Sequence, residues 1–370
     1  MSTPKTTQLL LAVLLGSASC KGQGHSSRAA SVSAVVVGAP TRAMREVEDL
    51  AGRRVLLPTS PTRVLTFGHS FAPIVALAPD VLVVRPGPFK ADPQAAPFLP
   101  TGVAELPQIG TGPNIDPESI KALHFDLAVG WNTAAFQREQ LKLLDRVSVP
   151  AVLVGVDRLD QYPATFRFLG RVLGREQRAE QLARYIEDAL ARMKTLTAAI
   201  PVDERLKVYY AEGVDGLTSQ CGLEGRAEVI RLAGALNVLS CEGIASSLSP
   251  VDVETHNAPI AIEALLVLSP DVIVTRFDKT AQTIRADTRW QRLRAVKEGR
   301  VYAIPHWPFG WFDRPPSFMR AMGMQWLAKR LYPKRDDLDL DLETSHFYSL
   351  FFGVTLDPAQ LRALLGSGAE

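Results

Sequence analysis

Residues 176–200 read EQRAEQLARYIEDALARMKTLTAAI and lie near the middle of a chain of 370 residues. The stretch contains neither Gly nor Pro, and its apolar residues recur at steps of three and four. These residues are Ala179, Leu182, Ala183, Ile186, Leu190, Met193 and Leu196. The pattern predicts one amphipathic helix, with Glu, Arg and Lys on its remaining faces. At about 1.5 Å per residue this helix would be about 37 Å long, which suits a connection between two lobes better than a cover for one sheet.

Two similar segments, 116–129 and 261–274, flank the predicted helix. In both, a Glu is followed five residues later by Leu and eight residues later by Asp. Each copy predicts a short helix, a turn that carries Asp and a buried strand, which together form one unit of an α/β layer. A coincidence of apolar spacing is the alternative. With a long helix between the copies, two similar lobes are the simpler interpretation.

The rest of the chain alternates short apolar strands with helices, which predicts an α/β fold of two doubly wound lobes with mainly parallel sheets. The predicted strands are 64–67, 81–84, 127–130, 151–154 and 206–211, and the predicted helices are 72–77, 136–144, 162–172, 226–232 and 317–331. The expected domains are an N-terminal lobe at 46–175, the interlobe helix at 176–200, a C-terminal lobe at 201–333 and a helical appendage on one lobe at 334–370.

Composition agrees with a globular protein. The chain is 46% hydrophobic and 22% charged, and its length is sufficient for two domains of typical size. Its net charge of +2 is small, and the sequence has neither a basic tract nor a pattern of interleaved basic and aromatic residues. Nucleic acid therefore has no support as a partner.

Residues 1–20 have the pattern of an export signal. Lys5 precedes the apolar run 9–15, which is too short to span a bilayer, and small residues lead to Cys20. Cys20 resembles the lipidated Cys of a bacterial lipobox, although Ser17 stands where Leu is usual. Cleavage near Ser19 without lipidation is the alternative. The segment 21–45 is rich in Ser, Ala and Gly and predicts a flexible tether.

Two further cysteines, Cys221 and Cys241, flank the predicted helix 226–232. In an oxidising compartment they form an even pair that could join the loops at the two ends of this helix. A disulfide between them is one expectation, and two free buried thiols are the other. No residue near either Cys marks a nucleophile.

Several motifs between about residue 47 and residue 333 resemble the substrate-binding proteins of ABC importers for iron-siderophore, haem and cobalamin. They are Asp49-x-x-Gly-Arg with Pro61-x-Arg63-Val64, Glu118 with Phe125-Asp126-Leu, AGALNV at 233–238, Glu263 with Ser269-Pro-Asp271-Val, WQRLRAVKEGRVY at 290–302, and Trp326-Leu-Ala with Leu331-Tyr-Pro333. Phe125 departs from the family, which usually has Pro there. The order and spacing of these motifs are more specific than any one of them.

The resemblance implies two lobes joined by one rigid helix, a ligand held in the cleft between them and little hinge motion. It also implies that one Glu on each lobe docks into a basic pocket of the permease dimer, whose ATPase lies in the cytoplasm. Glu118 and Glu263 stand at those positions. The alternative is that each Glu only begins a helix, where a carboxylate is favoured by the helix dipole.

Candidate ligand residues follow the predicted strands, because ligands of open α/β sheets bind beyond the carboxyl ends of strands. Aromatic rings there could pack on the organic frame of a chelate, and Arg side chains could neutralise its charge. As alternatives, the aromatic residues of loop 306–314 fill the junction with helix 317–331, Arg314 binds loop carbonyls, and Arg85 and Arg276 are solvated rim charges. The candidates are His69, Arg85, Trp131, Tyr210, Arg276, Trp307, Trp311 and Arg314.

Three other functions are alternatives to ligand delivery. His69, His256 and His306 could bind a bare metal ion directly, but they lack the close spacing of a metal motif. An exported hydrolase lacks the familiar nucleophile, zinc and phosphate motifs, and a structural or adhesive lipoprotein would bind no small molecule.

The preferred hypothesis is a monomeric, non-catalytic binding protein without a cofactor, exported to the periplasm or anchored in the cell envelope. Its expected ligand is a metal chelate that it delivers to an ABC permease. Ferric siderophore is favoured only by its frequency in the family. Cobalamin, haem and another chelate such as that of nickel remain alternatives.

Overall fold

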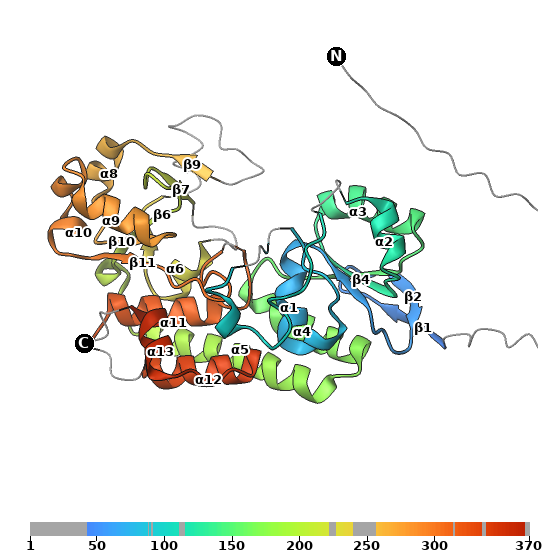
Figure 1. The fold of residues 1–370 in the computed structure, drawn as a ribbon. Coiled ribbons are helices and arrows are strands. Elements are labelled where there is room, and N and C mark those ends of the chain that lie inside the picture. Colours follow the sequence, from blue (N-terminus) through green and yellow to red (C-terminus); the bar gives the residue numbers. More distant parts are fainter. Residues whose placement is uncertain are drawn as a thin grey trace, which may run out of the picture. The chain divides into compact units, whose positions relative to one another are not determined.

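The computed structural model describes residues 43–87, 89, 92–110, 115–221, 227–239, 257–313, 315–334 and 338–366 (Figure 1). The predicted export signal with Cys20, and most of the predicted tether, lie outside these residues. The tether was predicted to extend to residue 45, but strand β1 (Met44–Glu48) already begins at Met44. The last residues of the predicted tether therefore belong to a strand.

The N-terminal lobe contains a parallel sheet in the order β3-β4-β5 and an antiparallel hairpin of β1 with β2. Its strands after β1 are β2 (Arg54–Pro58), β3 (Val64–Thr66), β4 (Leu127–Trp131) and β5 (Ala151–Val154), and its helices are α1 (Phe71–Leu77), α2 (Pro117–Ala122), α3 (Ala134–Arg146) and α4 (Tyr162–Leu173). The predicted strand at 81–84 is wrong, because Val81 ends a turn of 3-10 helix and Leu82 makes only an isolated bridge with Val64. A short apolar run alone does not separate a strand from other buried backbone.

The turn between β1 and β2 is fixed by Asp49. Its buried carboxylate accepts hydrogen bonds from the backbone N–H groups of Ala51 and Arg53, and also from that of Leu153 in β5. The Arg53 guanidinium binds the same carboxylate at 2.8 Å and donates to the Ala151 carbonyl. The motif Asp-x-x-Gly-Arg thus holds the hairpin against the edge strand β5, with Gly52 at a φ of +76° in the turn.

The C-terminal lobe contains a parallel sheet in the order β11-β10-β6-β8 and an antiparallel pair of β7 with β9. The strands are β6 (Lys207–Ala211), β7 (Thr218–Gln220), β8 (Leu236–Asn237), β9 (Asn257–Pro259), β10 (Val272–Thr275) and β11 (Val301–Ala303). The helices are α6 (Glu228–Leu232), α8 (Ile262–Leu268), α9 (Asp278–Ala286), α10 (Arg294–Lys297) and α11 (Arg320–Leu331).

The predicted central helix is confirmed as α5 (Glu176–Ala198). Its predicted apolar face is buried at five of seven positions, and Leu190 and Leu196 are partly buried. A Cβ atom at Gly170 of α4 would lie 2.4 Å from the Ala179 Cβ atom, so Gly170 permits the close approach of α4 and α5. Within the described ranges, every helix is too short or too polar to cross a membrane.

The sequence repeat corresponds to a structural repeat. In the first copy α2 leads to β4, and in the second α8 leads to β10. His124 and Ser269 occupy the same place in the two turns and both have a left-handed backbone, with φ values of +50° and +47°. The coincidence of a rare backbone conformation at matching positions supports the interpretation of two similar lobes.

Alternate residues of each sheet pack into different clusters. In the N-terminal lobe Leu65, Ala128 and Leu153 face an outer cluster, and in the C-terminal lobe Tyr209 and Ile273 do the same. The opposite faces of both sheets share one central cluster with α4, α5 and α11. Both parallel sheets are therefore covered on their two faces, which confirms the predicted α/β class.

The chain ends in α12 (Leu340–Phe352) and α13 (Pro358–Leu365). The expectation of an appendage on one lobe is wrong, because α12 contacts both lobes. The Tyr348 ring lies 5.9 Å from that of Phe98 in the N-terminal lobe, and the Phe352 ring lies 6.0 Å from that of Phe309 in the C-terminal lobe. The aromatic residues of α12 are thus part of the central cluster.

Candidate ligand-binding site

The loops at the carboxyl ends of the two sheets contact each other. Phe309, in the loop that follows β11, has its ring centroid 6.3 Å from that of Phe71 and 5.3 Å from that of Phe89. Phe71 begins the helix that follows β3. Ligands of open α/β sheets bind at such carboxyl ends, so these contacts locate the candidate site.

On the N-terminal lobe, His69 and Trp131 form one unit. Their rings lie 4.2 Å apart and are tilted by 47°, although 62 residues separate them in the sequence. The indole N–H of Trp131 donates to Oδ1 of Asp157 at 2.7 Å. Sequence reasoning named His69 and Trp131 separately and missed Asp157. The sequence does contain a signal for Asp157, because this residue follows strand β5 just as the other candidates follow their strands.

On the C-terminal lobe, Tyr210 and Asp313 lie on a cavity of about 140 Å³. The phenol of Tyr210 is buried and donates to Oδ1 of Asp313 at 2.7 Å. Burial raises the pKa of Tyr210 well above its ordinary value, and the carboxylates of Asp313 and Glu212 raise this pKa further. Tyr210 is therefore a neutral hydrogen-bonding group at physiological pH.

Arg276 supplies a cation at the rim of the same cavity. Its guanidinium lies 4.7 Å from the Phe277 ring centroid, and its Nη1 atom lies 3.8 Å from Oε1 of the buried Glu212. The Arg276 side chain is 36% exposed. Because the ion pair with Glu212 is long and the side chain is partly solvated, Arg276 keeps donors available for an anionic ligand.

Arg85 is buried, so the alternative of a solvated rim charge is wrong. Its Nε atom donates to the Leu106 carbonyl at 2.7 Å, and Nη1 lies 3.4 Å from the Phe89 carbonyl oxygen. Arg85 thus holds the loop that carries Phe89 beside the site. Direct contact of Arg85 with a ligand stays a prediction.

The loop 306–313 is mostly packed into the core. Trp311 is fully buried, and its indole N–H lies 3.4 Å from both the Trp307 carbonyl and the Tyr348 hydroxyl. A Cβ atom at Gly323 of α11 would lie 2.1 Å from the Trp311 carbonyl oxygen. The expectation that Trp311 faces the ligand is therefore wrong, because this ring fills the junction with α11. Arg314 lies outside the described residues.

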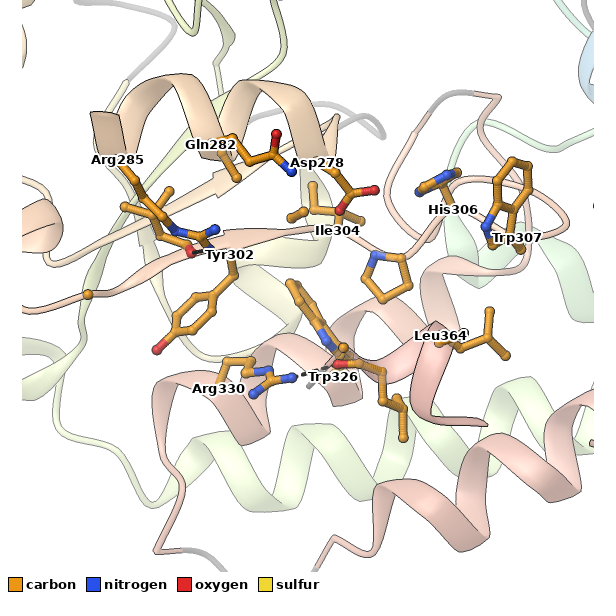
Figure 2. A pocket seen from close by; sticks show the side chains of 18 residues that line it. Asp278, Gln282, Arg285, Tyr302, Ile304, His306, Trp307, Trp326, Arg330 and Leu364 are labelled. Carbon is orange, nitrogen blue, oxygen red and sulfur yellow. Dashed lines mark hydrogen bonds between the residues drawn. The ribbon is translucent and has the colours of Figure 1, made fainter. Parts of the chain in front are cut away.

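Trp307 lines a different and larger cavity of about 450 Å³ (Figure 2). This cavity lies between α9, β11, α11 and α13, with Arg285, Tyr302 and Trp326 among its walls. His306 lines both cavities, and its ring lies 4.2 Å from that of Trp307. Of the aromatic residues in the predicted loop, His306 and Phe312 line the cavity with Tyr210 and Arg276, and the Phe312 ring lies 5.6 Å from that of Tyr210.

The two predicted docking residues occupy equivalent helix starts. Glu118 lies in the first turn of α2, and Glu263 lies in the first turn of α8. Both are exposed, and Glu118 makes an ion pair with Lys121 at 2.9 Å. The helix-start interpretation is correct for both residues, and their exposure leaves docking possible as well.

The remaining predictions concern metal ligands and cysteines. In the described part of the chain, no three His, Cys, Asp or Glu side chains come together as a possible metal site, and His256 lies outside that part. Cys221 is disulfide-bonded. Its expected partner, Cys241, is not among the described residues, so the pairing stays a prediction.

Comparison with known proteins decides the family. A model of a periplasmic binding protein family matches residues 74–307. This chain belongs to the periplasmic binding protein family. The match covers more than half of the chain, including α5 and all the strands of both parallel sheets except β3.

Relatives of this periplasmic binding protein include solved structures. An ABC transporter solute binding protein from Sulfurospirillum deleyianum is 33% identical, with a TM-score of 0.78, and the match covers 86% of this chain and 98% of that one. The molybdate-binding protein MolA from Haemophilus influenzae is 24% identical over 276 residues, which cover 66% of this chain and 72% of MolA. The vitamin B12 binding protein of Vibrio cholerae shares the fold, with a TM-score of 0.57, 20% identity and coverage of 76% and 100%.

These relatives establish the general role. The periplasmic binding protein is the substrate-binding component of an ABC transporter, a class that works with a permease and an ATPase. The family binds solutes and is periplasmic. The sequence resemblance to this family is therefore confirmed.

Proposed function

We propose that the protein captures a metal chelate, with ferric siderophore as its first expected ligand, and presents it to the permease. The observation that carries the proposal is that aromatic rings follow the strands of one sheet and a cationic side chain follows a strand of the other, at the carboxyl ends of both. His69 and Trp131 offer ring faces on one lobe, and Arg276 offers a partly exposed guanidinium on the other. Rings pack on the organic frame of a chelate, and Arg pairs with its anionic oxygens.

A small metal oxyanion is the second candidate. The cavity beside Tyr210 and Arg276 has a volume of only about 140 Å³, whereas pockets for larger organic ligands are commonly about 300–1,000 Å³. The partly exposed guanidinium of Arg276 on this cavity suits a tetrahedral oxyanion. MolA, a relative, is named as a molybdate-binding protein.

Titration of the protein without residues 1–20 distinguishes these ligands. The panel contains a ferric trihydroxamate, a ferric triscatecholate, ferric citrate, cyanocobalamin, haemin, sodium molybdate and free Fe, Ni, Zn and Mn ions. Calorimetry and tryptophan fluorescence should show saturable 1:1 binding of one ferric chelate, weakened about tenfold by Arg276→Ala. Arg292→Ala, elsewhere on the same lobe, serves as the control.

Each outcome decides between hypotheses. Binding of molybdate alone would favour the second candidate, and binding of cyanocobalamin or haemin alone would replace the siderophore with that chelate. Binding of a bare ion alone would favour the histidine hypothesis. If no compound bound, the metal-chelate proposal would be wrong.

The same proposal assigns Glu118 and Glu263 to permease docking and Cys20 to a lipid anchor. Exposed charges at interface rims act mainly on encounter and register, which suits reversible docking.

Mass spectrometry of the mature protein tests the anchor, because lipidation adds a diacylglyceryl group to Cys20. An unmodified N-terminus near residue 20 would show cleavage without an anchor.

A further inference from the structure

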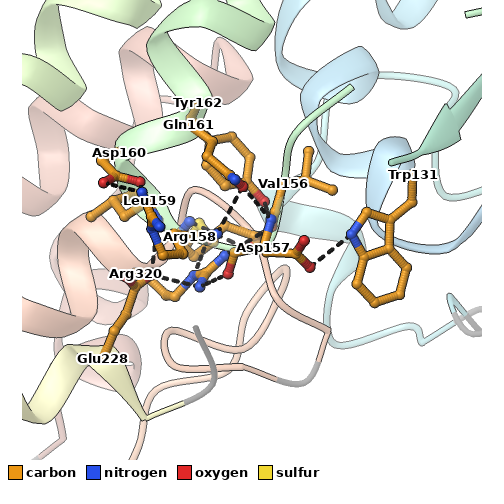
Figure 3. A network of polar contacts seen from close by, with 12 residues as sticks. Trp131, Val156, Asp157, Arg158, Leu159, Asp160, Gln161, Tyr162, Glu228 and Arg320 are labelled. Carbon is orange, nitrogen blue, oxygen red and sulfur yellow. Dashed lines mark hydrogen bonds and ion pairs between the residues drawn. The ribbon is translucent and has the colours of Figure 1, made fainter. Parts of the chain in front are cut away.

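A buried ion pair on the C-terminal lobe holds a loop of the N-terminal lobe (Figure 3). Arg320 of α11 is fully buried, and Glu228 of α6 is 5% exposed. Nη1 of Arg320 donates to Oε1 of Glu228 at 2.6 Å and to the Asp157 carbonyl at 2.6 Å. Nη2 of Arg320 donates to the Val156 carbonyl at 3.1 Å. The guanidinium therefore binds a carboxylate of its own lobe and two carbonyls of the opposite lobe.

Glu228 also binds the same loop directly. Its Oε1 atom, which binds Arg320, also accepts the backbone N–H of Leu159 at 2.8 Å. The loop 156–159 is thus fixed at both ends by one pair of opposite charges. Two buried charges are stable together only while their remaining hydrogen-bonding groups are satisfied, and here the backbone of the loop satisfies them.

Asp157 connects this held loop to the candidate ligand site. Its carbonyl accepts from Arg320, and its backbone N–H donates to Oε1 of Gln161 at 2.9 Å. Its side chain accepts the indole N–H of Trp131 at 2.7 Å. Trp131 in turn lies against His69, with ring centroids 4.2 Å apart. A continuous series of contacts therefore leads from the ion pair to the ring face proposed for the ligand.

We propose that Glu228 and Arg320 are positioning residues for the ligand site, which act by fixing Asp157 and through it the orientation of Trp131. Neither residue lies on the cavity beside Tyr210, so the effect on binding would be indirect. The inference rests on the proposed function only in taking Trp131 as a ligand contact. The placement of Trp131 by the pair can be measured without any ligand.

The first measurement concerns Trp131 itself. Subtracting the emission of the matching Trp131→Phe protein isolates Trp131 from the other tryptophans. Glu228→Gln keeps the size of the side chain and an acceptor for Leu159 but removes the charge that faces Arg320. We expect a red shift of the Trp131 emission and stronger quenching by acrylamide. Glu187→Gln, which loses an exposed ion pair with Arg167, should leave both unchanged.

A second variant keeps the proposal testable if Glu228→Gln does not fold. Asp157→Ala keeps the backbone carbonyl that Arg320 binds and removes the carboxylate that accepts the Trp131 indole N–H. It should reproduce the Trp131 changes of Glu228→Gln with a smaller loss in melting temperature. If the Trp131 emission is unchanged in both folded variants, the proposal is overturned.

The third measurement separates positioning from general stability. For the compound of the panel above that binds the wild type, we expect Glu228→Gln to weaken binding about tenfold. In a Trp131→Phe background the same substitution should cause no further loss. An equal loss in both backgrounds would show a purely structural role and overturn the proposal. If no panel compound binds the wild type, the metal-chelate proposal fails, while the emission of Trp131 still decides whether the pair positions this residue.

Discussion

Asp126 in the N-terminal lobe and Asp271 in the C-terminal lobe hold the two parallel sheets in the same way. Each lies two residues after a left-handed residue, just before a strand, and each binds the backbone at the start of the neighbouring strand. The Asp126 carboxylate accepts the backbone N–H groups of Thr62 and Arg63, ahead of β3. The Asp271 carboxylate accepts the backbone N–H of Lys207 at 2.7 Å, at the start of β6, and pairs with Arg294.

Replacing either aspartate should destabilise the fold. Asp126→Ala is expected to lower the free energy of unfolding by about 3 kcal/mol and Asp271→Ala by about 2 kcal/mol, because each removes the charged acceptor of partly buried backbone N–H bonds. Urea unfolding measures both values. Asp203→Ala, at an exposed position, should change the free energy by less than about 0.5 kcal/mol. Equal small effects of all three would contradict the assigned role.

Removing the docking charges should separate transport from ligand binding. Glu118→Gln with Glu263→Gln is expected to lower the stimulation of the transporter ATPase at least tenfold, because the proposed docking depends on charge pairs of these two residues with the permease. Ligand affinity should stay within twofold of the wild type. Glu105→Gln, also exposed, provides the control. Full ATPase stimulation by the double variant in proteoliposomes would exclude these residues from docking.

Phe351 of α12 should be essential for stability. Its ring is fully buried and is stacked on those of Phe347 and Phe318, with centroids 4.3 Å and 4.7 Å apart. Phe351→Ala is expected to lower the free energy of unfolding by about 3–5 kcal/mol, since it removes a large buried side chain and leaves a cavity. Leu342→Ala on the same helix, at a position that is 69% exposed, should have little effect. Similar values for the two variants would show that α12 is not part of the core.

The ion pairs between α4 and α5 should depend on pH. Arg167 and Arg184 lower the pKa of Glu180 from 4.5 to about 2. A carboxylate with a lowered pKa stabilises the folded state above its unfolded pKa, and this contribution is lost as the pH falls through the folded pKa. The free energy of unfolding of the wild type should therefore exceed that of Glu180→Gln by its largest amount at pH 6. The difference should be smaller at pH 3 and absent below pH 2.

Urea unfolding at several pH values measures this difference, which should be small because the Glu180 side chain is partly exposed and its ion pairs are screened by salt. Adding sodium chloride at pH 6 should reduce it further. A difference that grew on acidification would have the wrong sign for the assigned pairing.

Local patterns allowed much of the fold to be predicted. The spacing of apolar residues identified α5 because a helix repeats every 3.6 residues, and the strand 151–154 was predicted with the bounds that the structure gives. The left-handed residues His124 and Ser269 were not predicted, since neither is the Gly that usually marks this conformation. The role of α12 was underestimated because its burial depends on both lobes at once.

The site was less predictable because its contacts join distant segments. The register of β3 and β4 brings His69 next to Trp131, and no local pattern contains that register. A run of aromatic residues after a strand does not reveal which rings turn inward. Trp311 is buried against α11, whereas His306 lines a cavity. Asp157 was missed because no local pattern places its carboxylate beside the Trp131 indole.

The central cluster makes the two lobes one cooperative unit despite their repeated architecture. Either sheet, expressed as half a chain cut within α5, would expose the apolar face that it now shares with α4, α11 and α12. A chimera that exchanged one lobe for that of a relative would need to carry a compatible C-terminal helix as well. Loss of α12 would thus disturb the packing on both sides of the binding site. A ligand that contacts either lobe would stabilise the whole molecule against unfolding.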